Sequence, residues 1–379
     1  MARGVGLRGG GDLLMGRVKL QNWKRSITYH ASVVEVIHSA ADLQRIITDT
    51  ARYPSPVRAK GSHHSTTECV VAEGGTVCDM SQMKRIVSID KERMRVTLEA
   101  GVILYDAAKE LEKHGLQFYV NIELGNLTLG SGGTGNTKDA SYFANGNWEF
   151  GQVDSYCCAM KIVQADGSIR EIDEDTEPEL MEALRTGYGM LGIAYEVTFR
   201  VKPISAMKFR HELYHIDDFC AKFPQLLERK TSMMFYYFPF NNQVLIEIRE
   251  NSDLPLKPGS LAWKIRNWTW KTGWPFIANL FNFIPIKPWR YRISNFLNRA
   301  TAIFMLTKLK GKDSSPADQV IHYHPTAPFA SYTFSIWGFD RDTYPQALKD
   351  YYRFCREYDK AHGYRCDMLN VGYHIIQDR

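Results

Sequence analysis

The first residues that could do chemistry are glycines spaced as in phosphate-binding loops. A GxGxxG pattern begins at Gly130, and a second begins at Gly4. A dinucleotide fingerprint of this kind needs a strand before it and a helix after it. No strand precedes Gly4, and the pattern at Gly130 runs into NTKDASYFANGN, a poor helix former. The sequence therefore argues against a nicotinamide-binding Rossmann domain. Backbone N–H groups of a loop with several glycines can still approach an anion such as a pyrophosphate.

Two further glycine-rich segments accompany this loop. Residues 60–65 read KGSHHS, and residues 186–193 read TGYGMLGI. Each segment lies near the end of a predicted strand. Three such turns, spread over about 130 residues, are more than the phosphate of a single nucleotide requires.

Histidine and cysteine do not form a metal-binding pattern. His322 and His324 alternate as in a strand, so both would share one face, either of a sheet over the site or of a plain strand. A metal needs more ligands than this pair, and we expect none. The seven cysteines contain no CxxC pair, and Cys157 and Cys158 are adjacent. We therefore expect a reduced protein in the cytoplasm, either free or at a membrane surface.

Short strands and helices alternate along the chain, which predicts a mixed α and β protein. The boundary between two domains is placed near residue 204, after Pro203, where the composition changes. The predicted strands lie at 33–38, 76–79, 85–89, 95–100, 158–165 and 193–201, and the predicted helices at 39–50, 104–114 and 178–186. A long glycine-rich loop is predicted at 125–151. The second domain is expected to contain aromatic strands at 232–240, 244–248 and 331–337 and a final helix at 344–362.

Length and composition exclude several classes of protein. A chain of 379 residues suits two domains, and 44% hydrophobic with 23% charged residues is typical of a soluble globular protein. No apolar run approaches the roughly 18 residues that span a bilayer. The N-terminus lacks the long apolar core of a secretory signal.

The net charge of +5 is concentrated in one segment. Residues 254–312 contain eleven Lys and Arg and no Asp or Glu, so removing them from +5 leaves −6 for the rest. Five of the eight tryptophans lie between Trp263 and Trp289. We name residues 254–312 the basic insert. Tryptophans and cations beside an amphipathic helix suit an anionic membrane surface. The alternative is a cap subdomain whose aromatic side chains pack on the N-terminal domain, and we expect no nucleic acid partner.

Residues 30–203 resemble the FAD-binding domain of the vanillyl-alcohol oxidase superfamily, the PCMH-type FAD-binding oxidoreductases. This superfamily includes aldonolactone, alditol and decaprenylphosphoryl-ribose oxidases. The matching segments occur in the family's order: PVRAKGSHHS, GGTVCDMSQMKRIVSID, RVTLEAGVILYDAAKELEKHG, GNLTLGSGGTGNTKDAS, FGQVDSYCCAMKIVQADGSIREI and GYGMLGIAYEVTFRVKP. The resemblance implies an α+β protein with an N-terminal extension (1–29), a two-subdomain FAD-binding domain (30–204) and an α+β cap domain (205–379) that contains the basic insert.

The resemblance also implies the cofactor and its contacts. His64 takes the place of the histidine that many relatives bond covalently to the flavin 8α-methyl group. His63 is a neighbour that could compete for this bond or face solvent. Lys138 falls where relatives carry a histidine beside the flavin ring, and it is the candidate catalytic residue; the adjacent Asp139 could simply neutralise it. The residues implied around FAD are Gly61, Ser62, His63, His64, Ser65, Gly125, Thr128, Gly130, Ser131, Gly135, Thr137, Gly189, Gly192 and Ile193.

The sequence departs from the family near its C-terminus. The His-Trp-Gly-Lys motif of aldonolactone and alditol oxidases is absent, and the chain stops after the strand-like segment Val371–Ile376. The chain is therefore either a short variant or incomplete, which leaves the catalytic base unassigned.

The expected function is hydride transfer from a CH–OH group of a sugar, polyol or lactone to flavin N5, with oxygen or another acceptor reoxidising the flavin. The alternatives are flavin chemistry on a lipid-linked or sterol-like substrate at a membrane, or a catalytically silent membrane-bound scaffold.

Overall fold

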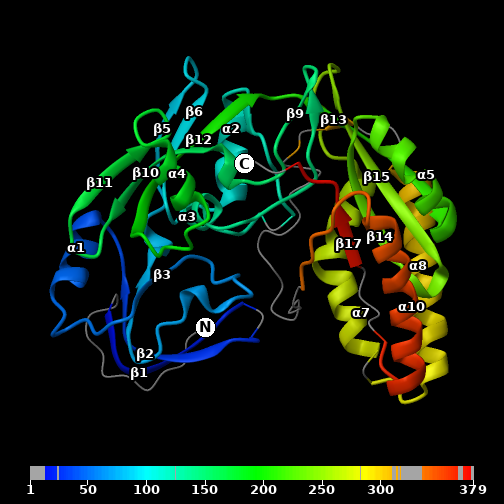
Figure 1. Ribbon diagram of the computed structural model, residues 1–379, viewed down its shortest axis with the longest axis horizontal. Helices are drawn as coiled ribbons and strands as arrows, with labels where there is room; N and C mark the ends of the chain where they lie inside the picture. Colours follow the sequence, from blue (N-terminus) through cyan, green and yellow to red (C-terminus); the bar gives the residue numbers. More distant parts are fainter. Residues whose placement is uncertain are drawn as a thin grey trace.

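The computed structural model describes residues 13–376, apart from positions 24, 124, 282, 310–312, 315, 317–334 and 366–369. The GxGxxG match at Gly4 and the pair His322/His324 lie outside the described residues, as does most of the strand predicted at 331–337. Figure 1 shows two domains, with the glycine-rich loops in the left-hand one and a cap sheet in the right-hand one. Among the helices described, none is long and apolar enough to cross a bilayer.

The first sheet has four strands in the order β1-β2-β4-β3, with an antiparallel β1–β2 pair and parallel pairing beyond it. Its strands are β1 (Leu13–Gln21), β2 (Thr28–Val36), β3 (Val57–Lys60) and β4 (Thr76–Asp79). Helix α1 (Ala40–Thr48) follows β2, and Ser39 and Asp42 form the capping box at its start. Strand β1 lies in the segment that the sequence predicted to be an N-terminal extension. This segment joins the first sheet because its seven residue pairs with β2 bury Val18 and Leu20.

The second sheet of the first domain is larger than the first sheet. Its strands follow the order β11-β10-β12-β6-β5, and β7 pairs with β12, all antiparallel. The strands are β5 (Ile86–Asp90), β6 (Arg95–Glu99), β7 (Leu116–Phe118), β10 (Cys157–Val163), β11 (Ile169–Asp173) and β12 (Ile193–Pro203). Helices α2 (Leu104–Lys113) and α4 (Pro178–Arg185) lie where the sequence predicted them, and their apolar faces enter the core of this sheet.

The predicted loop at 125–151 is more ordered than expected. Helix α3 (Leu129–Thr134) and the hairpin of β8 (Phe143–Ala144) and β9 (Asn147–Trp148) lie within it. The prediction of a long loop is wrong there because glycine allows close packing. A Cβ atom on Gly133 would lie 3.1 Å from the sulfur of Cys157, so a larger residue would push α3 off the sheet.

The cap domain begins after β12 and is built on one antiparallel sheet with the order β16-β13-β15-β14-β17. The strands are β13 (Ala206–His215), β14 (Ser232–Phe238), β15 (Gln243–Ser252), β16 (Asp313–Ser314) and β17 (Asn370–Tyr373). Helices α5 (Ile216–Glu228) and α10 (Tyr344–His362) share an apolar core with it. The helix predicted at 344–362 is confirmed.

The basic insert supplies helices to a second core of the cap sheet. They are α6 (Leu261–Trp268), α7 (Trp274–Phe281) and α8 (Lys287–Lys308), with a π-helical turn between α6 and α7. Trp263 is buried against Phe209, and Met305 and Leu309 of the α8 end join the same cluster. These side chains therefore pack mainly on the cap sheet, whereas the alternative reading of the insert had placed its aromatic side chains on the N-terminal domain.

The C-terminal segment returns from the cap sheet to the first domain, as the red segment in Figure 1 shows. After β17, the carbonyl of His374 accepts a hydrogen bond from Ser141 N–H (2.9 Å). The carbonyl of Ile376 accepts one from Gly151 N–H (3.1 Å). The two domains are thus joined at the β12–β13 connection and again by this segment.

Candidate functional site

Two of the three glycine-rich segments meet directly. Gly61 follows β3, and Thr128 precedes α3. A Cβ atom added to Gly61 would lie 2.1 Å from the Thr128 hydroxyl oxygen, a distance that real atoms do not tolerate. The side chains of Thr128 and Ser131 are in turn 3.2 Å apart, from Oγ1 to Oγ. The structure therefore brings residues 61–65 and 125–137 into one site.

The third segment joins the same site from the start of β12. The N–H of Tyr188 donates to the carbonyl of Thr134 (3.0 Å), and the Tyr188 ring lies against Gly135. Gly189 (φ +77°) and Gly192 (φ +148°) turn the chain in conformations that favour glycine. Ile193 is then buried at the first pair of β12 with β10. The convergence of three turns, predicted from sequence, is present.

The backbone N–H groups differ in their availability for an anion. Among the described residues, those of Gly61, Ser62 and Ser65 have no hydrogen-bond partner. The N–H of Gly130 instead donates to Ala100 (2.8 Å), and that of Thr137 to Gly135 (2.8 Å). The segment after β3 therefore offers free donors to the site.

The two adjacent histidines have different surroundings. The ring of His63, which has a φ of +60°, packs edge-on against Tyr29, with Nε2 3.5 Å from the tyrosine hydroxyl. Burial, with a contribution from Lys60, lowers the pKa of His63 to about 4. His63 is thus half-buried rather than facing solvent. The ring of His64 lies 4.9 Å from that of Trp23, between centroids.

Lys138 lies at an isolated bridge with Gln152, half-buried beside α3. Burial lowers the pKa of its ammonium group. No ion pair forms at Lys138 within the described residues. The idea that Asp139 neutralises it is wrong, because the Asp139 carboxylate binds an arginine of the cap.

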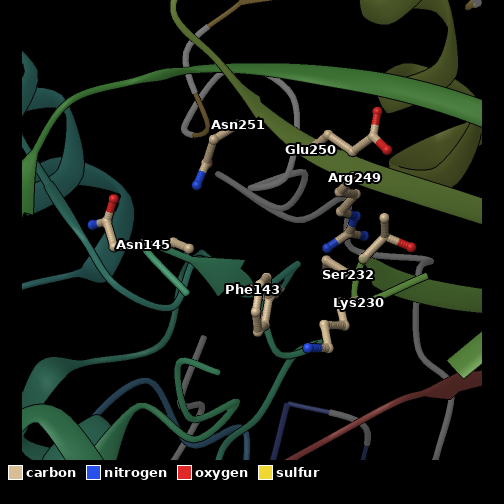
Figure 2. Close-up of a pocket in the computed structure, with 9 residues that line it drawn as sticks. Phe143, Asn145, Lys230, Ser232, Arg249, Glu250 and Asn251 are labelled. Carbon is tan, nitrogen blue, oxygen red and sulfur yellow. The ribbon is translucent and has the colours of Figure 1, made fainter. Parts of the chain in front are cut away.

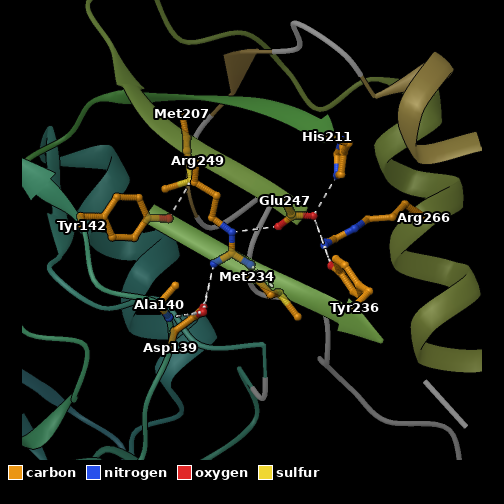
Figure 3. Close-up of polar contacts among 10 residues, drawn as sticks. All are labelled: Asp139, Ala140, Tyr142, Met207, His211, Met234, Tyr236, Glu247, Arg249 and Arg266. Atoms are coloured by element: carbon orange, nitrogen blue, oxygen red, sulfur yellow. Dashed lines mark hydrogen bonds and ion pairs between the residues drawn. The ribbon is translucent and has the colours of Figure 1, made fainter. Parts of the chain in front are cut away.

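That arginine is Arg249 of β15, and Figure 3 shows its contact with Asp139. Nη1 of Arg249 lies 3.0 Å from both carboxylate oxygens of Asp139, and both residues are buried. Nε of Arg249 donates to Glu247 (2.8 Å), two residues earlier in β15. Because side chains two apart share a face of a strand, Glu247 and Arg249 lie on the same face of β15.

Glu247 is the centre of the buried network in Figure 3. Its Oε2 accepts from Arg266 Nη2 (2.9 Å) and from the Tyr236 hydroxyl (3.2 Å), and it lies 3.2 Å from His211 Nε2. Arg266 belongs to α6, so the basic insert contributes a cation to the interior. Two arginines thus face two carboxylates, as buried charges require.

Burial and pairing act on these carboxylates in opposite directions. Burial raises the pKa of Asp139 to about 6, although Arg249 favours its charged form. Burial also works to raise the pKa of Glu247, but Arg266 and Arg249 outweigh it and hold the pKa well below its usual range. Burial raises the pKa of the nearby Glu123. A region of strongly shifted carboxylates therefore lies beside the glycine-rich loops.

A cavity of about 360 Å³ opens between the two domains next to this network. Figure 2 shows its walls, the β8–β9 hairpin on one side and the β14–β15 sheet on the other. Arg249 belongs both to this wall and to the buried network. The lining residues are Phe143, Ala144, Asn145, Lys230, Thr231, Ser232, Arg249, Glu250 and Asn251. Its volume suits a small polar molecule.

Sequence reasoning missed the cap side of this site. Glu247, Arg249, His211, Tyr236 and Arg266 were not among the predicted residues. One signal was present: Glu247 and Arg249 place two opposite charges on one face of a strand, directly after the apolar residues 244–246. No group of three or more His, Cys, Asp or Glu within the described ranges is arranged to hold a metal.

Residues 31–173 match a protein family described as an FAD binding domain. This part of the chain is an FAD binding domain. The matched residues contain the first two glycine-rich segments of the site, and both sheets of the FAD-binding domain have strands in them. The predicted family and the α+β fold class are confirmed.

Several relatives of the FAD-binding chain are lactone-oxidising proteins by name. It is 26% identical over 256 residues to L-gulonolactone oxidase of Bos taurus, which covers 67% of this chain and 54% of the relative. It is 23% identical over 239 residues to L-gulono-1,4-lactone dehydrogenase of Mycobacterium tuberculosis (62% and 53%). It is 22% identical over 233 residues to mitochondrial L-galactono-1,4-lactone dehydrogenase of Brassica oleracea (60% and 37%). The chain spans about half the length, or less, of these relatives.

The residues of the site fit FAD. The free N–H groups of Gly61, Ser62 and Ser65 are the donors that a pyrophosphate needs. The tight contact of Gly61 with Thr128 holds this segment against α3.

Proposed function

We propose that this chain is an FAD-dependent oxidase or dehydrogenase that oxidises a CH–OH group of a sugar lactone, sugar or polyol. One observation carries the proposal: the segment with the free backbone donors meets residues 125–137 at Thr128, and Asp139, just beyond them, pairs with the buried Arg249 of the cap. The names of the lactone-oxidising relatives agree with it. Oxygen or another acceptor completes the cycle.

Each side of the proposed site has a separate task. Gly61, Ser62 and Ser65 hold the pyrophosphate, together with the turns at 125–137 and 189–193. The chemistry that bound FAD supplies is acceptance of a hydride at N5. Lys138 stabilises negative charge in the site. Its ammonium group is half-buried, and a cation acts more strongly on a nearby charge where little water screens it. The cavity at Arg249 receives the hydroxyl-rich substrate.

Anaerobic reduction of the flavin tests this function. The purified chain should show the two visible flavin bands, and a panel of aldonolactones, sugars and polyols should bleach them without oxygen. Protein without flavin bands would favour a catalytically silent scaffold. Flavin bands that no member of the panel bleaches would contradict oxidation of these substrates.

We propose that His64 bonds covalently to the flavin. The ring of His63 contacts Tyr29, which makes His64 the better candidate of the two for the bond. After acid precipitation, flavin should remain with the wild type and be released from His64→Ala. His63→Ala is the matched control and should retain it. Flavin released from the wild type would refute the bond.

A second candidate is flavin chemistry on a lipid-linked or sterol-like substrate at a membrane surface. The exposed Trp268 and Trp289 of the basic insert favour it. In the reduction panel, a prenyl-phosphoryl sugar and a sterol dispersed in vesicles should bleach the flavin if this candidate is correct. Bleaching by a water-soluble lactone alone would reject it.

A further inference from the structure

The helices of the basic insert have large apolar side chains on their exposed side as well as on their buried side. A surface helix buries its apolar stripe and exposes its polar face. In α8, the buried positions include Ser294, fully buried, and Asn298. The exposed positions Trp289, Ile293 and Phe296 are apolar, and Phe296 is 69% exposed. Their spacing of four and three residues places them on one face.

Helix α6 repeats this arrangement. Leu261, Ile265 and Trp268 have the same four-and-three spacing, and all are exposed, Leu261 by 73%. Trp263 and Arg266, on the opposite side, are the buried residues of this helix. The inner face of α6 is therefore buried in the cap, and its apolar outer face remains exposed.

The segment after α6 adds to the exposed apolar surface. Leu280 of α7 and Phe283 just beyond it are exposed, while Trp274 and Phe281 are buried. Three successive helices thus bury one side and expose large apolar side chains on the other. We call the exposed apolar side chains of α6, α7 and α8 the outer face. Exposed apolar side chains that repeat along a helix in this way are typical of an interaction site rather than of a solvated surface.

Charge decides which partner fits the outer face. Lys264, Arg292 and Arg299 are exposed, and they form no ion pair within the described residues. Arg292 and Arg299 are seven residues apart, so they flank one side of the α8 stripe. The insert contains no Asp or Glu. A symmetric pair of these chains would place the same cations opposite one another, which opposes self-association.

We propose that the outer face docks on an anionic phospholipid bilayer, with its apolar side chains at the headgroup level and its cations on lipid phosphates. Apolar insertion and cation attraction are the two contributions that hold amphipathic helices at such surfaces. The proposal deepens the membrane candidate above by naming the surface and its lipid chemistry. It rests on the helices of the insert and does not require any particular flavin substrate.

Flotation of the full chain with vesicles tests the docking. Vesicles of phosphatidylcholine mixed with phosphatidylserine should carry the wild type upward, and phosphatidylcholine alone should carry at least tenfold less. Raising the salt concentration should release the protein, because screening weakens the attraction. Equal binding to both vesicles, or binding to neither, would overturn the proposal.

Two variants locate the contact. Trp289→Ser/Phe296→Ser removes apolar side chains and Arg292→Gln/Arg299→Gln removes cations; each should lower the bound fraction at least tenfold. Phe354→Ser is the matched control, since Phe354 is an exposed aromatic residue of α10 outside the insert. Flavin absorbance and thermal melting confirm that each variant is folded. Equal flotation of the control and the insert variants would contradict the assignment.

The same experiments separate this proposal from the proposed enzymatic function. If the wild type floats but no substrate reduces its flavin, the docking proposal stands and the lactone-oxidising function is rejected. If substrates reduce the flavin but the protein never floats, the function stands and the docking proposal is rejected. If the outer-face variants abolish self-association of a chain that never floats, the surface belongs to a second copy and the proposal fails.

Discussion

Arg249 of the cap sheet lies 3.0 Å from both carboxylate oxygens of Asp139 in the FAD-binding domain. This pair joins the residue next to Lys138 to a strand whose other charge, Glu247, reaches the basic insert through Arg266. This one group of buried charges therefore fixes the position of the cap sheet relative to the loop that contains Lys138 and Asp139. One nitrogen, Nη1, makes both contacts, and a charge-assisted contact of this kind is stronger than one between neutral groups.

Removal of one member of this pair should be costly. Asp139→Asn removes one of the two carboxylates that contact the buried Arg249 guanidinium, and we expect the free energy of unfolding to fall by up to about 3–5 kcal/mol. Urea denaturation measures it. Asp350→Asn is the control, because its pair with Arg353 is exposed and should be worth about 1 kcal/mol or less. Equal losses in the two variants would show that the buried pair has no special role.

Gly61 should not tolerate even a methyl group. In Gly61→Ala the new Cβ would lie 2.1 Å from the Thr128 hydroxyl oxygen, so the two loops must separate. We expect flavin occupancy to fall sharply and stability to drop by about 1–3 kcal/mol. Adding Thr128→Ala should restore part of both. Gly338→Ala, with no atom within 4 Å of the new Cβ, should change neither. Rescue failing in the double variant would place the strain elsewhere.

Protonation of His63 should destabilise the fold. Its pKa falls from 6.5 to about 4 on folding, so the neutral form is favoured in the native state. The associated stability is complete above pH 6.5 and is lost as pH falls toward 4. Between about pH 7 and about pH 5, His63→Gln should therefore lose less stability than the wild type. Parallel losses in urea melts at the two pH values would contradict this.

Lys138 should act on turnover more than on binding. We expect Lys138→Met to lower kcat about 100-fold while KM and flavin occupancy change little, since one lost charge contact to a reacting group costs this much. Lys138→Arg should recover part of kcat because it keeps the positive charge. Lys91→Met, an exposed control, should behave as wild type. A change confined to KM would assign Lys138 to substrate binding.

The buried and the exposed tryptophans of the basic insert should contribute differently to the stability of the fold. Trp263 is buried against Phe209, and Trp263→Ala should lower stability by about 3–5 kcal/mol. Trp268, five residues on, points outward, and Trp268→Ala should stay within about 0.5 kcal/mol of the wild type. Thermal melts compare them. Similar losses in both variants would mean that the outer face is packed in solution.

Local sequence signals predicted the elements that have strong ends or periodicity. Ser39 and Asp42 marked the start of α1, and apolar spacing marked α2 and the final helix α10. Strand β1 was missed because its pairing with β2 outweighs its glycine and its polar positions. Helix α3 was missed because glycine is a poor helix former, and packing on the sheet overrides that preference here.

The candidate site was predictable only on its backbone side. Glycine spacing revealed the three turns, since close approach of a backbone restricts the residue type. The cap side depends on contacts such as Asp139–Arg249, whose partners are 110 residues apart in the chain. Nothing local in either sequence segment specifies the other. The network could therefore be found only once the fold brought the two strands together.

The return of the C-terminal segment has a consequence for dissecting the molecule. Ser141 and Gly151 receive their hydrogen-bond partners from His374 and Ile376, beyond the whole cap domain. A fragment cut at residue 204 would leave these amides without those partners and expose Asp139 without Arg249. The FAD-binding domain thus depends on contacts from the cap domain and the C-terminal segment. Deletion of the cap should disturb the loop that contains Lys138.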